Sequence, residues 1–226
     1  MDIFKIIQSS VDISISSYSW FFKNILTVLK SSIPTLFLIF LIFLVAPSYT
    51  ALIIPIFIWL IFSAAFHLNR LIVLEESISL IKLIQPSKKV FIFIIYFFIY
   101  FLSMGLIEQA FLLLTAASFL DLSFGLINLI FIIIGCLLAA YLFSSLSILL
   151  PAVAVDRDLK STWMLSKQMD TSIQILISTI LVILPLMLIG FLVGSMEEYL
   201  LPFFFLIFFL VINIHLGLWL HRLEMK

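Results

Sequence analysis

The side chains best placed to do chemistry in this sequence are histidines and arginines near the ends of two long apolar segments. His215, Trp219 and Arg222 recur at steps of four and three, so they share one face of a helix. His67 and Arg70 share a face in the same way. Basic groups at a membrane boundary can bind the phosphate of an anionic lipid headgroup. The candidate headgroup-binding set is therefore Arg70, His215, Trp219 and Arg222, and an ordinary interfacial anchor of Trp and Arg is the favoured alternative.

Motifs of common enzymes are missing from the sequence. It has no HExxH pair, no phosphate-binding glycine loop and no G-x-S-x-G elbow. Two Glu-Glu pairs, at 75–76 and 197–198, fall in boundary loops, where a solvated surface explains them better than acid–base catalysis. His67 and His215 lack a third metal ligand, and Cys136 is the one cysteine. We predict no enzyme activity, no metal and no cofactor.

Composition places the chain in a membrane. Hydrophobic residues make up 65% of it and charged residues 11%, against about 45–50% and about 25% in soluble domains. One soluble core cannot bury that much apolar surface, so lipid must surround most of the chain. The formal net charge of zero removes the case for a nucleic-acid partner.

Six apolar segments are long enough to cross a bilayer, whose core of about 30 Å needs about 20 helical residues. The run at 33–68 is too long for one span and is expected to break at a turn over 46–50, which contains Pro47. Its first helix is expected to begin near Ile25. The further spans are expected at 90–114, 124–150, 173–193 and 200–220. We predict an all-α polytopic membrane protein with six transmembrane helices arranged as three hairpins.

The basic residues predict the orientation. All 12 Lys and Arg residues fall on one side of the six-segment pattern: Lys5, Lys23, Lys30, Arg70, Lys82, Lys88, Lys89, Arg157, Lys160, Lys167, Arg222 and Lys226. The stretches on the opposite side, at 47–51, 117–123 and 195–199, have none. Because basic residues in short loops stay in the cytoplasm, both termini are expected there.

The chain divides into an N-terminal helix and one transmembrane domain. Apolar residues recur at steps of three or four through residues 1–30, which is typical of an amphipathic helix lying in the membrane interface. Residues 31–226 form the six-helix domain. An interfacial helix plus a hairpin could be repeated three times, at 1–75, 76–155 and 156–226. Selection for basic residues on one side would give the same pattern without a repeat.

Two further segments could make contacts. Leu159 and Trp163 share one face of the loop segment 158–168, which is expected to be an interfacial helix anchored by its Trp. A docking element for a cytoplasmic partner is the alternative. A GxxxG at 190–194 could mark a dimer face, or close packing within one molecule.

The segment that ends the predicted fourth span, together with the stretch after it, is similar in sequence to a group of known membrane proteins. LLPAVAVD at 149–156 is followed by a polar stretch with Ser161, Trp163 and Ser166. This arrangement resembles bacterial six-helix integral membrane proteins of the YciC-like group, and is similar to the membrane domain of some glycerophosphodiester phosphodiesterases. The resemblance implies a bacterial cytoplasmic (inner) membrane protein and brings no catalytic residues.

The expected function follows from what the spans contain. The predicted middle of the membrane has no charged residue, which argues against a proton relay or an ion-coupled transporter. We expect a non-enzymatic protein acting in lipid organisation or envelope assembly, with membrane lipids and other membrane proteins as partners. The alternative is a small permease or export component that moves an apolar or zwitterionic substrate without ion coupling.

Overall fold

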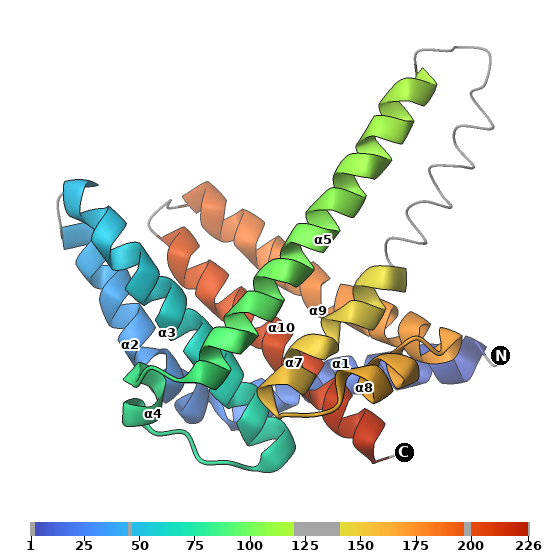
Figure 1. Ribbon diagram of the computed structural model, residues 1–226, viewed down its shortest axis with the longest axis horizontal. Helices are drawn as coiled ribbons and strands as arrows, with labels where there is room; N and C mark the ends of the chain where they lie inside the picture. The colour runs from blue at the N-terminus through green and yellow to red at the C-terminus, as the bar shows by residue number, and fades with distance from the viewer. Residues whose placement is uncertain (1–2, 45–46, 120–140, 197–199, 226) are drawn as a thin grey trace.

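The computed structural model describes residues 3–44, 47–119, 141–196 and 200–225, and all its regular elements there are helices. The all-α prediction is confirmed for these residues. The elements are α1 (Ile3–Lys23), α2 (Ile25–Leu44), α3 (Pro47–Leu74), α4 (Leu80–Ile84), α5 (Lys88–Phe119), α7 (Leu149–Ala154), α8 (Leu159–Ser166), α9 (Met169–Met196) and α10 (Leu201–Glu224). Figure 1 shows α2 beside α3 and α9 beside α10, with α5 leaning away from both pairs.

Four of the described helices are long and apolar enough to cross a membrane: Ile25–Ile42, Ile53–Leu74, Met169–Leu192 and Leu201–Glu224. A helix satisfies its own backbone hydrogen bonds, which a segment in lipid requires. These four agree with the predicted first, second, fifth and sixth spans. The predicted third span, 90–114, is helical within α5. Most of the predicted fourth span, 124–150, and Cys136 lie outside the described residues.

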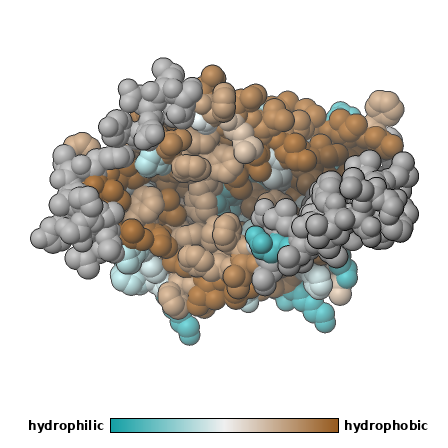
Figure 2. Space-filling view, turned by 90° about the horizontal axis from the view of Figure 1, so that it is seen from above, coloured by the Kyte–Doolittle hydropathy of each residue, from teal (hydrophilic) through white to brown (hydrophobic). Residues whose placement is uncertain are grey.

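The outer surface of the helices is largely apolar. Phe37 is 61% exposed on α2, Phe101 66% on α5 and Phe191 77% on α9. Seen from above, the described part of the surface is mostly hydrophobic (Figure 2). Burying a large apolar side chain is worth about 1.5–3 kcal/mol, so such a surface is stable only against lipid or another apolar partner.

Residues 47–50 of the turn predicted at 46–50 are helical. Pro47 begins α3, and the residues expected to form a turn after it are helical. Proline is well suited to the first helical turn, because the N–H that it lacks would have no intrahelical partner there and its φ is already helical. Pro202 likewise lies in the first turn of α10, which begins at Leu201. At the other end of this pair of helices, α2 begins at Ile25 as predicted, after a break at Asn24.

The centre of the bundle is the contact between α3 and α10. Leu68, Ile214 and Trp219 belong to one buried cluster at this contact and have no exposed surface. Gly217 permits the approach: a Cβ there would lie 2.7 Å from Asn69 Oδ1 and 3.2 Å from Ile72 Cδ1. Small residues serve this purpose widely at helix contacts in membranes.

Replacing Gly217 with alanine should lower the thermal unfolding temperature in detergent. The added methyl overlaps Asn69, and overpacking of this kind costs about 1–3 kcal/mol. Gly105→Ala in α5 is the matched control, because its Cβ would meet none of the described residues within 4 Å. It should be neutral or slightly stabilising. Equal unfolding temperatures for the two variants would contradict this account of the α3–α10 contact.

The first glycine of the GxxxG sequence packs within the molecule. A Cβ at Gly190 would lie 2.5 Å from the ring of Phe204 on α10. The α9–α10 contact therefore explains the need for a small residue at this position, which favours the intramolecular reading of the motif.

Candidate functional site

The basic residues gather where several helix ends meet. Figure 1 places the first turns of α2 and α5, the last turns of α3 and α10, and the short helices α4 and α8 on its lower side. We call this the basic side; it carries Lys30, Arg70, Lys89, Arg157 and Arg222. The polar groups that could act on a ligand or partner lie mostly here or one to two turns inside it.

Arg70 is the centre of an ion-pair network on the basic side. Its guanidinium donates to Glu76 through Nε (2.8 Å) and Nη2 (2.5 Å). Its Nη1 donates to the Ala154 carbonyl (2.9 Å) and to Asp156 Oδ2 (3.1 Å). Lys89 Nζ donates to the same Asp156 oxygen at 2.5 Å. Arg70 thus joins the end of α3 to the end of α7, and Asp156 joins both to the start of α5.

Electrostatics and backbone conformation both single out Asp156. The Lys89 ammonium, and then Arg70, hold the pKa of the Asp156 carboxyl below its usual range. Hydrogen bonds from Arg70 likewise lower the pKa of Glu76. Asp156 also has a φ of +59°, and Glu75, at the end of α3, has a φ of +56°. Asp enters this left-handed region more readily than most residues, so it can end α7 and still present its carboxylate to the two cations.

The polar face of α1 packs against α9. The Ser10 and Ser14 hydroxyls lie 3.2 and 3.1 Å from the carbonyls of Gln174 and Ser178. The Tyr18 hydroxyl donates to the Val182 carbonyl at 2.7 Å. Each of these pairs is separated by 164 residues, so α1 and α9 run parallel in constant register over two turns. The apolar stripe of α1, which includes Phe4 and Ile15, is exposed.

A buried hydrogen-bond chain joins α1, α9 and α10. Trp219 Nε1 donates to Ser178 Oγ (2.8 Å), and His215 lies 3.2 Å from Ser178 Oγ through Nε2 and 2.9 Å from Ser17 Oγ through Nδ1. Ser17 donates to the Ile13 carbonyl at 2.7 Å. If His215 is protonated on Nδ1, every group in the chain has a partner: Trp219 to Ser178, Ser178 to His215, His215 to Ser17, Ser17 to Ile13. His215 and Trp219 are fully buried.

Arg222 lies one turn beyond this chain, nearer the basic side. Its guanidinium donates to the Ser9 carbonyl of α1 at 3.3 Å and stands 5.7 Å from the centroid of the Trp219 ring. Together with the buried hydrogen-bond chain, these contacts attach α1 to α10 as well as to α9.

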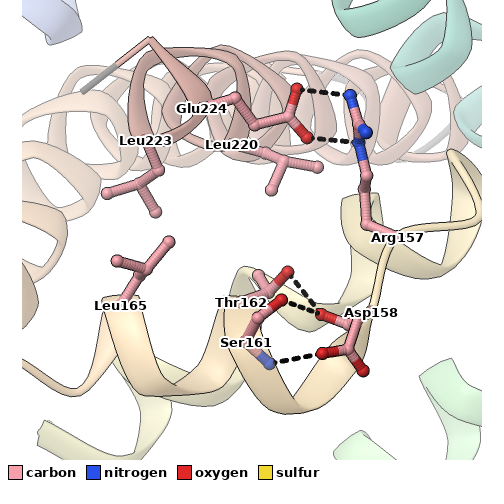
Figure 3. A pocket seen from close by; sticks show the side chains of 8 residues that line it. All are labelled: Arg157, Asp158, Ser161, Thr162, Leu165, Leu220, Leu223 and Glu224. Atoms are coloured by element: carbon pink, nitrogen blue, oxygen red, sulfur yellow. Dashed lines mark hydrogen bonds and ion pairs between the residues drawn. The ribbon is translucent and has the colours of Figure 1, made fainter.

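A pocket of about 310 Å³ opens between α8 and the end of α10. Figure 3 shows Leu220 and Leu223 on one wall facing Leu165 on the other, with the Arg157–Glu224 ion pair closing one end. The two groups of that pair meet at 2.6 and 3.0 Å. Asp158 caps α8 by accepting from the backbone N–H of Ser161 at 3.0 Å, which lowers the pKa of its carboxyl.

The helix predicted at 158–168 is present as α8, but Leu159 and Trp163 differ in their exposure. Leu159 is half-buried against the main core, whereas Trp163 is 42% exposed with the Lys167 ammonium 5.2 Å from its ring centroid. Met164 is exposed beside Trp163. The exposed residues suit either a membrane anchor or a docking face, and both stay predictions.

The structure does not bring the four predicted headgroup residues to one surface. His215 and Trp219 are fully buried and serve the hydrogen-bond chain, and Arg70 is only 15% exposed and ion-paired. Arg222 is partly exposed. Headgroup binding at either arginine stays a prediction, while His215 and Trp219 have no surface to offer a headgroup.

Sequence reasoning missed the serines that hold α1. Ser10, Ser14 and Ser17 lie at steps of four and three, which is the small-residue spacing of helix contacts in membranes. That spacing could have indicated a packed face. The partner Ser178 has no comparable signal, because Thr179 beside it is equally polar and the sequence does not distinguish them.

The described residues do not form a metal site. No group of three His, Cys, Asp or Glu side chains among them could hold a metal ion. His67 Nε2 is buried and lacks a hydrogen-bond partner within the described part of the chain, as does Trp59 Nε1 two turns earlier on α3.

We found no family model, no curated protein and no solved structure that matches this chain.

Proposed function

We propose that this chain is a non-enzymatic integral membrane protein that acts in lipid organisation or envelope assembly. The observation that carries the proposal is the position of its apolar pockets. One lies on α5 among Ile95, Phe98 and Leu102, and another lies over α2, α3 and α4. Both are open to the surroundings of the bundle and are lined almost wholly by apolar side chains, as suits contact with lipid.

The proposed topology has six spans in three hairpins. The four described membrane-length helices supply spans one, two, five and six. We assign span three to α5 and span four to the segment that ends in α7. The basic side then faces the cytoplasm of a bacterium, with both termini there, since basic residues in short loops are retained on that side. The YciC-like resemblance agrees with this placement and is itself part of the proposal.

Cysteine labelling tests the topology. Single cysteines at Tyr49, Leu122 and Ser195, in a Cys136→Ala background, should react with a membrane-impermeant thiol reagent in intact cells. Cysteines at Ser87 and Ser161, on the basic side, should react only after the membrane is opened. Labelling of the Ser161 position from outside would overturn the six-span arrangement.

Purification and reconstitution test the function. In a mild detergent the protein should retain a selective set of lipids or membrane proteins from its native membrane, at a level that survives washing. Vesicles containing the purified protein should show no faster release of a labelled zwitterionic solute than empty vesicles. Rapid protein-dependent release, without selective retention, would replace the proposal with a permease.

A further inference from the structure

The outer face of α2, α3 and α4 carries a groove of about 390 Å³. Its lining residues are all apolar or aromatic: Ile33, Pro34, Phe37, Leu38, Ile56, Trp59, Leu60, Leu80 and Ile84. The short helix α4 forms the end nearer the basic side, since it lies there beside α2 and α3 (Figure 1). A volume of this size is typical of sites that take a small molecule or part of a larger one.

Two buried polar atoms on helices that line this groove lack a partner among the described residues. Trp59 lines the groove, and its Nε1 has no hydrogen-bond partner among the described residues. The hydroxyl of Thr35, which follows the groove residue Pro34 on α2 and is fully buried, also lacks one. Trp Nε1 is a donor only, so an oxygen acceptor that reached it from the groove would satisfy it.

An exposed lysine lies on α2 near the residues that line the groove. Lys30 precedes Pro34 and Phe37 by four and seven residues, so it shares their face of α2 one turn nearer the basic side. Its side chain is exposed and its ammonium group makes no hydrogen bond or ion pair with the described residues. Going inward from the basic side, the order expected from this spacing is an exposed cation, a buried donor and an apolar wall.

We propose that the α2–α3–α4 groove binds one anionic glycerophospholipid. An acyl chain lies along Phe37, Leu38 and Ile56, a glycerol-ester carbonyl accepts from Trp59 Nε1, and the headgroup phosphate pairs with Lys30. This order of groups matches a phospholipid from the membrane inward. A second copy of the chain would present apolar helix faces and leave Lys30 and the Trp59 donor unmatched. The inference gives the proposed lipid role a defined binding site.

Native mass spectrometry can test the site. The protein is released from nanodiscs made with equal amounts of phosphatidylglycerol and phosphatidylcholine, and bound lipids are counted on the intact chain. Wild type should retain one phosphatidylglycerol in preference to phosphatidylcholine. Lys30→Gln should lower that preference about fivefold, as expected for one basic residue at an anionic surface. Trp59→Phe should weaken retention of both lipids by about two- to tenfold, the effect of one hydrogen bond.

Matched variants separate the groove from the general surface. Ile56→Trp fills the groove and should abolish retention, whereas Ile54→Trp, two residues away and equally exposed to the surroundings, should not. Lys23→Gln removes a neighbouring exposed lysine and should leave the preference unchanged. If the Ile56→Trp variant does not fold, Lys30→Gln still tests the site, because the Lys30 side chain is exposed and its replacement should not affect folding.

Equal retention by wild type, Lys30→Gln and Ile56→Trp would overturn the proposal. So would a lipid-free dimer that Ile56→Trp dissociates, since the groove would then be a contact between copies. The outcome is separable from that of the proposed function: a protein that releases solute from vesicles could still hold this lipid. Conversely, selective lipid retention that survives Ile56→Trp would keep the lipid role and reject this site.

Discussion

Replacing Ser178 with alanine should markedly lower the stability of the bundle and loosen α1. The Ser178 hydroxyl serves Trp219 Nε1 and His215 Nε2 together, so one substitution leaves two fully buried groups without partners. A hydrogen bond between membrane helices contributes about 0.6 kcal/mol on average and up to about 1.7. Two such bonds predict a loss of about 1–3 kcal/mol, measured as a lower thermal unfolding temperature in detergent.

The control is Ser103→Ala on α5. Within the described part of the chain, Ser103 bonds only to the Ile99 carbonyl of its own helix, so its loss should change the unfolding temperature little. Ser17→Ala should give an intermediate effect and raise hydrogen exchange in α1, since it breaks the link from α1 to His215. If Ser178→Ala and Ser103→Ala unfold at the same temperature, the buried hydrogen-bond chain through Ser178 and His215 does not hold α1 to α10.

Replacing Arg70 with glutamine should be the most disruptive change on the basic side. It removes hydrogen bonds to two carboxylates and to the Ala154 carbonyl. Breaking a fully buried ion pair costs about 3–5 kcal/mol, but Glu76 and Asp156 are 39% and 50% exposed. Water can therefore solvate the orphaned carboxylates, and we expect about 1.5–3 kcal/mol, the range of hydrogen bonds to charged groups.

Lys88→Gln is the matched control for Arg70→Gln. Lys88 is exposed at the start of α5 beside Lys89, and no ion pair or hydrogen bond joins its ammonium group to the described residues. The variant loses the same charge from the same side of the bundle. Similar unfolding temperatures for the two variants would show that net charge, and not the network around Arg70, sets the effect.

The network around Arg70 also predicts a pH dependence. The pKa values of Glu76 and Asp156 are lowered in the folded state, so their stabilisation is fully present above their unfolded values of about 4.3 and about 3.9 and is lost as pH falls through the lowered values. Unfolding temperature should fall on acidification below about pH 4. In Arg70→Gln this acid-dependent loss should shrink, because the cation that lowers both pKa values is absent.

Hydropathy by itself predicted the four membrane-length helices of the described residues, because it is a local property. Each span in lipid must satisfy its own backbone, so about 20 apolar residues predict a helix whatever its neighbours are. The prediction failed in detail at Pro47, where the same residue that ends a helix can begin one. The side on which the basic residues gather was also readable, since it depends only on which loop each residue occupies.

The partners of the polar side chains were decided only by tertiary structure. His215, Trp219 and Arg222 do share a face of α10, but the sequence could not say whether lipid headgroups or α1 and α9 would cover it. That depends on how each helix is rotated and on a register that relates residues 164 positions apart. The same holds for α1. Its sequence defined an apolar and a polar face, but only the packing of its serines against α9 left Phe4 and Ile15 on the outside. The serine hydroxyls also bond to carbonyls of α1 itself. In lipid an apolar face gains little by turning inward, whereas small serines let α1 approach α9 closely, so the serine face packs.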